Sequence, residues 1–303
     1  MKVALVDVDG YNFPNFALMK IAAWHRQNGD NVKWYDPLYD RPERIYKSKV
    51  FTFTPDTPDY WDGEIFRGGT GYWRYDDLAP EIDAMPPDYS IYPQYDFAIG
   101  FLSRGCIRKC PWCVVPHKEG ALRKYDDIAR IAQGRKKVIL MDNNFLANDF
   151  DFVKEQLEKS VRLELKIDFN QGLDARLVTP EIAKLLAKCK WTTISGNNAY
   201  IRFSCDTQKM IAPLKDAISI LRDVGYNGGI FVYVLAIDVA EAHDRIMQIC
   251  SVDQKIHPFC QPYRDFGGDG QIHDSELKRL ARWCNIASVR KSCTFQDYKR
   301  GKQ

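Results

Sequence analysis

The sequence lacks the features that would place it at once among membrane, secreted or strongly nucleic-acid-binding proteins. Its longest apolar runs, such as residues 230–237, are far shorter than the ~20 residues that cross a bilayer. The chain runs from Met1 and Lys2 directly into a strand-like segment, without an apolar signal region or a small-residue cleavage site. No run of five or more like charges occurs, and the net charge is only +3. We therefore expect a cytoplasmic protein that makes no membrane contact.

The size and the cysteine usage narrow the class further. With 303 residues, of which 45% are hydrophobic, the chain can form a large core, and the length predicts one large and one small domain. In a reducing compartment, cysteines persist as buried small side chains or as ligands. Six of the nine are isolated in sequence, and we expect them in the core: Cys189, Cys205, Cys250, Cys260, Cys284 and Cys293. The other three lie within eight residues of one another.

Residues 1–95 begin with the pattern of a β-α-β unit. Apolar periodicity predicts a strand over residues 2–7, a helix over 16–27 and a strand over 32–35. A turn-rich stretch follows, with a short strand candidate at residues 50–53. The glycines at Gly68, Gly69 and Gly71 favour a tight turn, although such a cluster can also hold a phosphate at a helix start. This part of the chain predicts a small Rossmann-like α/β domain.

From residue 97 onward, short apolar runs alternate with helical patterns about every thirty residues. The predicted strands cover residues 97–102, 138–141, 165–169, 200–205, 230–237 and 256–261. The predicted helices cover residues 123–133, 150–159, 180–188, 208–224 and 239–249. Six successive β-α units predict an α/β fold with a parallel sheet, curled into a partial (β/α)6 TIM-like barrel over residues 96–262. Residues 263–303 contain a helical pattern from Asp274 and are predicted to cover the barrel.

Three cysteines follow the first strand of this α/β region directly. Cys106, Cys110 and Cys113 have the spacing C-x3-C-x2-C, on the loop at the carboxyl end of the strand. Active sites of parallel barrels lie on that face. Thiolate is the soft ligand that iron-sulfur clusters need, so three such groups can hold a 4Fe-4S cluster. Three ligands for four irons leave one iron free to bind a substrate or cofactor.

Two other interpretations of these cysteines are open. With His117, they would form a Cys3His zinc site, and such sites are usually closed and structural. The protein would then be a zinc-stabilised binding module, in which the aromatic stretch over residues 60–95, including Tyr60 and Trp61, recognises nucleic acid or protein. The same aromatic stretch would equally suit packing between two domains. The third interpretation is three structural thiols.

The cysteine motif, with Trp112 before its last cysteine and six β/α units around it, resembles the radical S-adenosylmethionine (SAM) superfamily over residues 97–262. The resemblance implies that Cys106, Cys110 and Cys113 ligate a 4Fe-4S cluster and that Trp112 lies near the adenine of SAM. It further implies an enzyme that reductively generates a 5′-deoxyadenosyl radical for hydrogen abstraction from an unknown substrate. An electron donor such as flavodoxin or ferredoxin would be its partner.

The same resemblance points to further candidates at the strand ends. After the second strand, Asp142 and Asn143 replace the superfamily's Gly-Gly-Glu motif and are candidates for the amino group of SAM, although a turn with a helix cap explains them equally. The polar ending resembles members that carry a cobalamin-binding-like domain. The other cofactor-binding candidates are Asn170, Gln171, Arg202 and Asp206, of which Asp206 also suits a helix cap. The candidates for a catalytic role in the barrel lumen are Arg176, Tyr233 and Gln261, although the alternation of a strand explains Tyr233 equally well.

The N-terminal residues 1–95 look similar to a degenerate cobalamin-binding domain that precedes such a barrel. In that domain type, an Asp-x-His-x-x-Gly segment supplies the histidine that binds cobalt. This chain has Asp7-Val8-Asp9-Gly10 without a histidine, and the pattern around His25 predicts a solvent-facing helix position. These observations argue against cobalamin as a cofactor.

Overall fold

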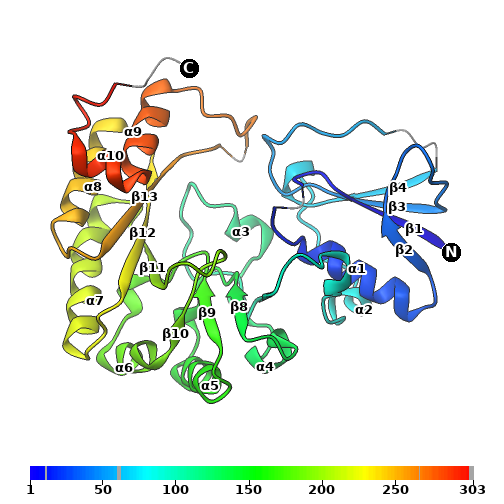
Figure 1. Cartoon of the computed structure of the whole chain (residues 1–303), viewed down its shortest axis with the longest axis horizontal. Helices are drawn as coiled ribbons and strands as arrows, with labels where there is room; N and C mark the ends of the chain where they lie inside the picture. The colour runs from blue at the N-terminus through cyan, green and yellow to red at the C-terminus, as the bar shows by residue number, and fades with distance from the viewer. Residues whose placement is uncertain (11, 60–62, 266, 300–303) are drawn as a thin grey trace.

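Parallel pairing of strands organises the whole chain, as the computed structural model shows for residues 1–10, 12–59, 63–265 and 267–299 (Figure 1). The fold is α/β, as the sequence predicts. One four-stranded sheet belongs to the N-terminal part, and a four-stranded and a three-stranded sheet belong to the rest. Within each of these three sheets every strand pair is parallel.

The N-terminal sheet has the strand order β2-β1-β3-β4. Its strands are β1 (Lys2–Asp7), β2 (Asn31–Trp34), β3 (Arg44–Ser48) and β4 (Glu64–Gly68). Helix α1 (Phe16–Gln27) begins at Asn15, whose side chain accepts a hydrogen bond from the Leu18 amide, and it lies against the sheet (Figure 1). The short helix α2 (Pro80–Asp83) lies beside α1. The predicted β-α-β start is confirmed.

The strand predicted at residues 50–53 is wrong. This segment is a turn, because the Asp9 carboxylate accepts hydrogen bonds from the backbone amides of Val50 and Phe51 that a strand would use for pairing. Strands β3 and β4 flank it instead, and neither was predicted. The expected turn at the glycines is confirmed: Gly69 has a φ of 99°, and a Cβ there would lie 2.3 Å from the carbonyl oxygen of Lys49.

The other parallel strands form two sheets, which meet beyond the end of β9. The first has the order β10-β9-β8-β5 and the second the order β11-β12-β13. Their bounds are β5 (Ala98–Gly100), β8 (Lys137–Leu140), β9 (Lys166–Phe169), β10 (Lys190–Trp191), β11 (Tyr200–Ser204), β12 (Gly229–Ala236) and β13 (Ile256–Pro262). A parallel bridge between Leu173 and Phe203 connects the end of β9 to β11. All six predicted strands are present, with the short β10 added.

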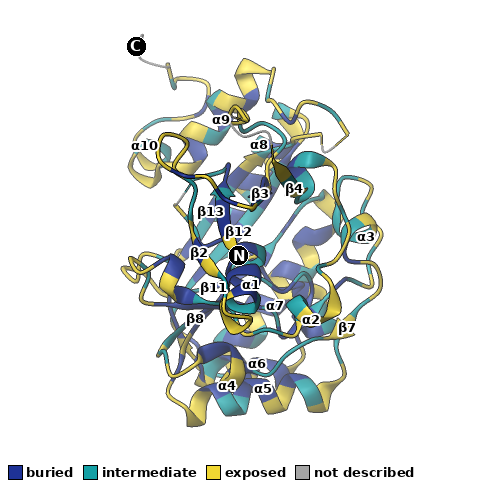
Figure 2. Cartoon of the chain, turned by 90° about the vertical axis from the view of Figure 1, so that its right-hand side faces the viewer, coloured by how far each residue is buried: buried dark blue, intermediate teal, exposed yellow. Residues whose placement is uncertain are grey.

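Figure 2 shows that the larger helices of this part carry buried residues on one side and exposed residues on the other. Helices alternate with these strands along the chain. They are α3 (Val115–Lys118), α4 (Ile128–Ala132), α5 (Phe150–Arg162), α6 (Pro180–Lys188), α7 (Ile211–Asp223), α8 (Val239–Cys250), α9 (Ser275–Asn285) and α10 (Ala287–Ser292). A side chain caps the start of α4, α5, α6, α8 and α9. In α6, Thr179 caps the Ile182 amide and Pro180 occupies the first turn.

The helix predicted over residues 123–133 is mostly wrong, because only α4 at its end is helical. Its first residues form β7 (Arg123–Lys124), which pairs antiparallel with β6 (Ser103–Arg104). This small hairpin closes the segment that contains the cysteine motif. The predicted helix over residues 208–224 consists of a short 3-10 turn followed by α7.

The N-terminal sheet packs against the rest of the chain through aromatic and polar contacts. Tyr92 is fully buried, and its hydroxyl donates a hydrogen bond of 2.7 Å to the carboxylate of Asp7. Tyr89 is also buried, which supports the packing interpretation of the aromatic stretch, whereas Trp73 is 46% exposed. Tyr60 and Trp61 lie outside the described residues.

The prediction that His25 faces solvent is wrong. Its imidazole is fully buried and lies 2.7 Å from Asp30 and 2.9 Å from the hydroxyl of Tyr46. An apolar-periodicity argument could not identify this position, because the two polar partners come from outside the helix.

The C-terminal segment packs on the second sheet, and its predicted role as a cover for a barrel stays a prediction. Helix α9 begins at the cap residue Asp274 and contacts β13 and α8. The segment before it reaches the N-terminal part, where the Arg264 guanidinium lies 4.0 Å from the centre of the Phe53 ring. The side chain of Gln271 also donates to the Phe53 carbonyl oxygen at 3.2 Å. The segment before α9 thus contacts the N-terminal part of the chain.

Candidate functional site

Most of the predicted site residues follow the carboxyl ends of β5, β8, β9 and β11, whereas Arg202, Tyr233 and Gln261 lie within strands. Because β5, β8 and β9 are parallel neighbours and β11 joins them through the Leu173–Phe203 bridge, their ends meet at one edge. Side-chain contacts confirm that the loops converge. Asp174, after β9, lies 3.2 Å from Nε of Arg108 on the cysteine loop and 3.5 Å from Nδ2 of Asn144 after β8.

The cysteine loop begins at a residue that must be glycine. Gly105 has a φ of 82°, and a Cβ on it would lie 2.2 Å from the carbonyl oxygen of Ala121. The next residue, Cys106, donates its backbone N–H to the Gly120 carbonyl oxygen at 3.3 Å. This close approach ties the start of the loop to the chain that leaves it.

The three thiols of the motif are partly exposed and free. Burial raises the pKa of the Cys110 thiol above its ordinary value, and the charge of Asp206 adds to the rise. Burial also raises the pKa of the Cys113 thiol. Because iron-sulfur clusters bind the thiolate, loading this loop would release protons from both groups.

Asp142 and Asn143, the predicted contacts for the amino group of SAM, hold the backbone of the cysteine region. The Asp142 carboxylate accepts hydrogen bonds from the Leu102 amide at 3.0 Å and the Ser103 amide at 2.6 Å. The side-chain oxygen of Asn143 accepts from the Gly105 amide at 2.9 Å. These contacts favour a positioning role for both side chains, and their binding of a cofactor stays a prediction.

Asp142 leads to a pH-dependent prediction. Burial raises its pKa to about 7, although the amides of Leu102 and Ser103 favour the charged form. The folded chain therefore holds a proton that the unfolded chain loses near pH 4, so the associated stability is complete below pH 4 and is lost as the pH rises to about 7. We expect stability to fall by roughly 2–3 kcal/mol more between pH 5 and pH 8 in the wild type than in Asp142→Asn. Urea denaturation at both pH values measures this, and equal losses would contradict it.

Asn144 and Asp174, which the sequence did not single out, also contact the cysteine loop, and Asp174 is paired with the predicted candidate Arg176. The Nδ2 of buried Asn144 lies 3.4 Å from the Cys106 sulfur. Asp174 is 6% exposed and forms a two-point ion pair with Arg176, at 2.6 and 2.9 Å. Burial acts to raise the pKa of Asp174, but the Arg176 guanidinium outweighs it and holds the pKa below its ordinary value.

Arg202, another predicted cofactor contact, is committed to a buried ion pair. Its guanidinium lies 2.6 and 2.9 Å from the two carboxylate oxygens of fully buried Asp168. A further guanidinium nitrogen lies 3.4 Å from the Tyr233 hydroxyl, which donates to the Asn170 carbonyl oxygen at 2.7 Å. The lumen candidate Tyr233 and the cofactor candidate Asn170 thus belong to one hydrogen-bonded group that spans three strands.

The remaining predicted site residues differ in how far they are exposed. Trp112 and Asp206 are partly buried, whereas Gln171, Arg176 and Gln261 are exposed. Asp206 does not cap α7, whose N-cap is Met210. Its charge instead acts on Cys110, and burial raises the pKa of the Asp206 carboxyl itself. Cofactor binding or catalysis by these residues stays a prediction.

The described residues contain neither a single-ion metal site nor a helix that could span a membrane. No three histidine, cysteine or acidic side chains among them lie close enough to hold a single metal ion, and His117 is exposed on α3. In the same residues, we find no helix with the length and apolarity that a bilayer span requires.

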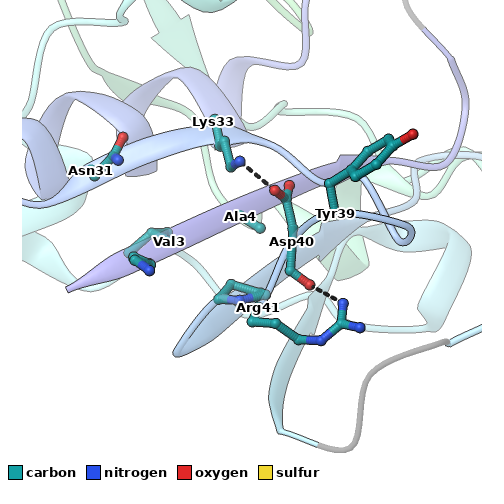
Figure 3. A pocket seen from close by; sticks show the side chains of 9 residues that line it. Val3, Ala4, Asn31, Lys33, Tyr39, Asp40 and Arg41 are labelled. Carbon is teal, nitrogen blue, oxygen red and sulfur yellow. Dashed lines mark hydrogen bonds and ion pairs between the residues drawn. The ribbon is translucent and has the colours of Figure 1, made fainter.

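A cavity of about 130 Å³ lies in the N-terminal part, at the edge of β1 and β2 (Figure 3). Lys33 pairs with Asp40 there, and the Asp40 carbonyl oxygen accepts from Arg41 at 2.7 Å. None of the predicted site residues lines this cavity.

Fold and site together define an α/β protein with a three-cysteine loop at the carboxyl edge of its parallel strands. Over 97 residues the chain is 33% identical to the ribosomal protein uS12 methylthiotransferase RimO from each of two strains of Thermus thermophilus. The match covers 29% of this chain and 22% of each relative. This local similarity supports the radical SAM superfamily and an enzyme of that kind. No protein-family model matches the chain.

Proposed function

We propose that the chain is a radical SAM enzyme with a 4Fe-4S cluster on Cys106, Cys110 and Cys113. The observation that carries this proposal is the position of the C-x3-C-x2-C loop, directly after β5 at the edge where the loops after β8 and β9 converge. The partial similarity to RimO supports it. Since only 22% of that protein is matched, its methylthiotransferase activity is not carried over, and the substrate of this chain is unassigned.

The residues present fit such a cluster. Three sulfur donors lie on one loop, and thiolate is the ligand that iron-sulfur clusters require. Beside them, the side-chain oxygen of Asn144 is buried and has no hydrogen-bond partner among the described residues. When bound, the cluster and SAM would supply a 5′-deoxyadenosyl radical by one-electron reduction of SAM, which also yields methionine. Around them, Asp142 and Asn143 hold the loop in place.

We further propose that the two sheets act as one partial (β/α)6 barrel over residues 96–262. The Leu173–Phe203 bridge and the Asp168–Arg202 ion pair both cross the seam between them, which supports a continuous curved wall. On its inner side, partly buried rings form a chain of contacts, with Phe231 5.0 Å from Tyr233 and 5.6 Å from Phe259 between ring centres. This wall is where a substrate would bind.

Residues 1–95 are proposed as a Rossmann-like domain and residues 263–303 as a helical extension. The histidine within residues 1–95, His25, is buried and contacts Asp30 and Tyr46, and the argument against cobalamin stays a prediction. A cytoplasmic location and an electron donor such as flavodoxin or ferredoxin stay predictions.

Anaerobic reconstitution with iron and sulfide tests the proposal. After dithionite reduction, we expect an electron paramagnetic resonance signal of a reduced 4Fe-4S cluster that changes when SAM is added, and we expect 5′-deoxyadenosine in the same tube. If the chain forms no cluster and binds stoichiometric zinc instead, the enzyme proposal is wrong. The zinc-stabilised binding module would then replace it.

A further inference from the structure

The sulfur of Cys106 accepts two N–H groups from different parts of the structure. One comes from the backbone amide of Arg108, 3.3 Å away on the same loop. The other comes from the side chain of Asn144, after β8, at 3.4 Å. Asn144 is only 4% exposed, so water does not compete strongly for this contact.

The neighbours of Asn144 decide which end of its amide faces the thiol. Its NH2 group lies between two acceptors, the Cys106 sulfur and the Asp174 carboxylate at 3.5 Å. A carbonyl oxygen in that place would face only acceptors, so the Cys106 sulfur and the Asp174 carboxylate together fix the orientation of the amide. In the opposite orientation, the lone pairs of the Asn144 side-chain oxygen would also face the negative charge of Asp174. Asp174 itself is held by Arg108 and Arg176.

We propose that Asn144 is a positioning residue that raises the reduction potential of the cluster on Cys106, an inference that rests on the proposed function. An N–H group directed at a thiolate withdraws charge from the sulfur and favours the more negative, reduced state. The step concerned is the uptake of one electron from a donor, without any bond being formed or broken. The Asp174 carboxylate, whose charge would oppose this effect, is paired with the guanidiniums of Arg108 and Arg176.

The test compares the reconstituted wild type with Asn144→Leu, whose side chain has the same branching and number of heavy atoms but no N–H donor. Redox titration with dithionite, followed by electron paramagnetic resonance, measures the potential. We expect the equilibrium constant for reduction to fall about tenfold, which corresponds to a decrease of ~59 mV for a one-electron couple. Asn148→Leu is the matched control, because it removes a hydrogen bond to the Phe145 carbonyl oxygen but no contact with a thiol. The control should titrate like the wild type.

A second variant shows whether an effect of Asn144→Leu comes from poor packing of the leucine. Asn144→Ser is smaller and too short to reach the sulfur, and it should lower the potential in the same direction. Equal potentials in the wild type and both Asn144 variants would overturn the inference, as would an equal shift in Asn148→Leu. If neither Asn144 variant holds iron while Asn148→Leu does, Asn144 only supports cluster binding and the tuning role is wrong. A wild type that assembles no cluster overturns the proposed function itself.

Discussion

Replacing Cys106 with alanine is expected to abolish cluster assembly and SAM cleavage. Loss of an outer contact at a metal site typically costs 10–100-fold in affinity or activity, and loss of a ligand should exceed that. We therefore expect bound iron to fall from about four to less than about one per chain. The 5′-deoxyadenosine yield should fall by more than about 100-fold. Iron analysis and product chromatography of the reconstituted variant measure both effects.

A matched cysteine separates this effect from general damage. Cys293 is also partly exposed, but its sulfur lies 3.6 Å from the Val289 carbonyl oxygen in the C-terminal segment, away from the motif. Cys293→Ala should keep full iron and full yield. If Cys106→Ala keeps its iron while its circular dichroism matches the wild type, Cys106 is not a ligand. If the wild type holds zinc that Cys106→Ala loses, the thiols form a zinc site instead.

Much of the fold could be predicted because its signals are local. The capping of α6 by Thr179 and the spacing of apolar strands are readable within a few residues. Strand β3 was missed because its pattern includes charge: Lys47 is buried in the sheet and is neutralised there by Asp56 and Asp59. A buried lysine with partners more than eight residues away has no signature in hydrophobic periodicity. The false strand at residues 50–53 has the opposite cause, since its apolar residues lie in a turn held by Asp9.

The residues of the site also divide into those with a local sequence signal and those that only the fold brings together. The cysteine motif is contiguous, so its spacing identifies it without knowledge of the fold. Asn144 and Asp174 are separated by thirty residues and reach the loop only because the ends of parallel strands meet. A signal for Asn144 existed, since it directly follows the predicted Asp142 and Asn143. For Arg202, the sequence identified the position at a strand but not its partner, Asp168 on the neighbouring sheet.

Replacing Arg202 with leucine is expected to cause the largest loss of stability among the substitutions considered. The change leaves the fully buried Asp168 carboxylate without its two-point partner. Breaking a buried ion pair in this way typically costs ~3–5 kcal/mol, because the remaining charge is buried and unpaired. The guanidinium also packs 4.7 Å from the centre of the Phe231 ring, and that contact is lost as well. Urea denaturation at pH 7 measures the difference in unfolding free energy.

The double variant Asp168→Leu with Arg202→Leu shows whether the orphaned charge is the cause. Without either charge, the site carries no unpaired group, so the double variant should be more stable than Arg202→Leu alone. Lower pH should also partly rescue Arg202→Leu, because the isolated Asp168 carboxyl can then take up a proton. A double variant as unstable as the sum of both single variants would mean that the pair contributes through packing alone. Since Arg202 lies on β11 and Asp168 on β9, a non-additive result would show that this charge pair stabilises the seam between the two sheets.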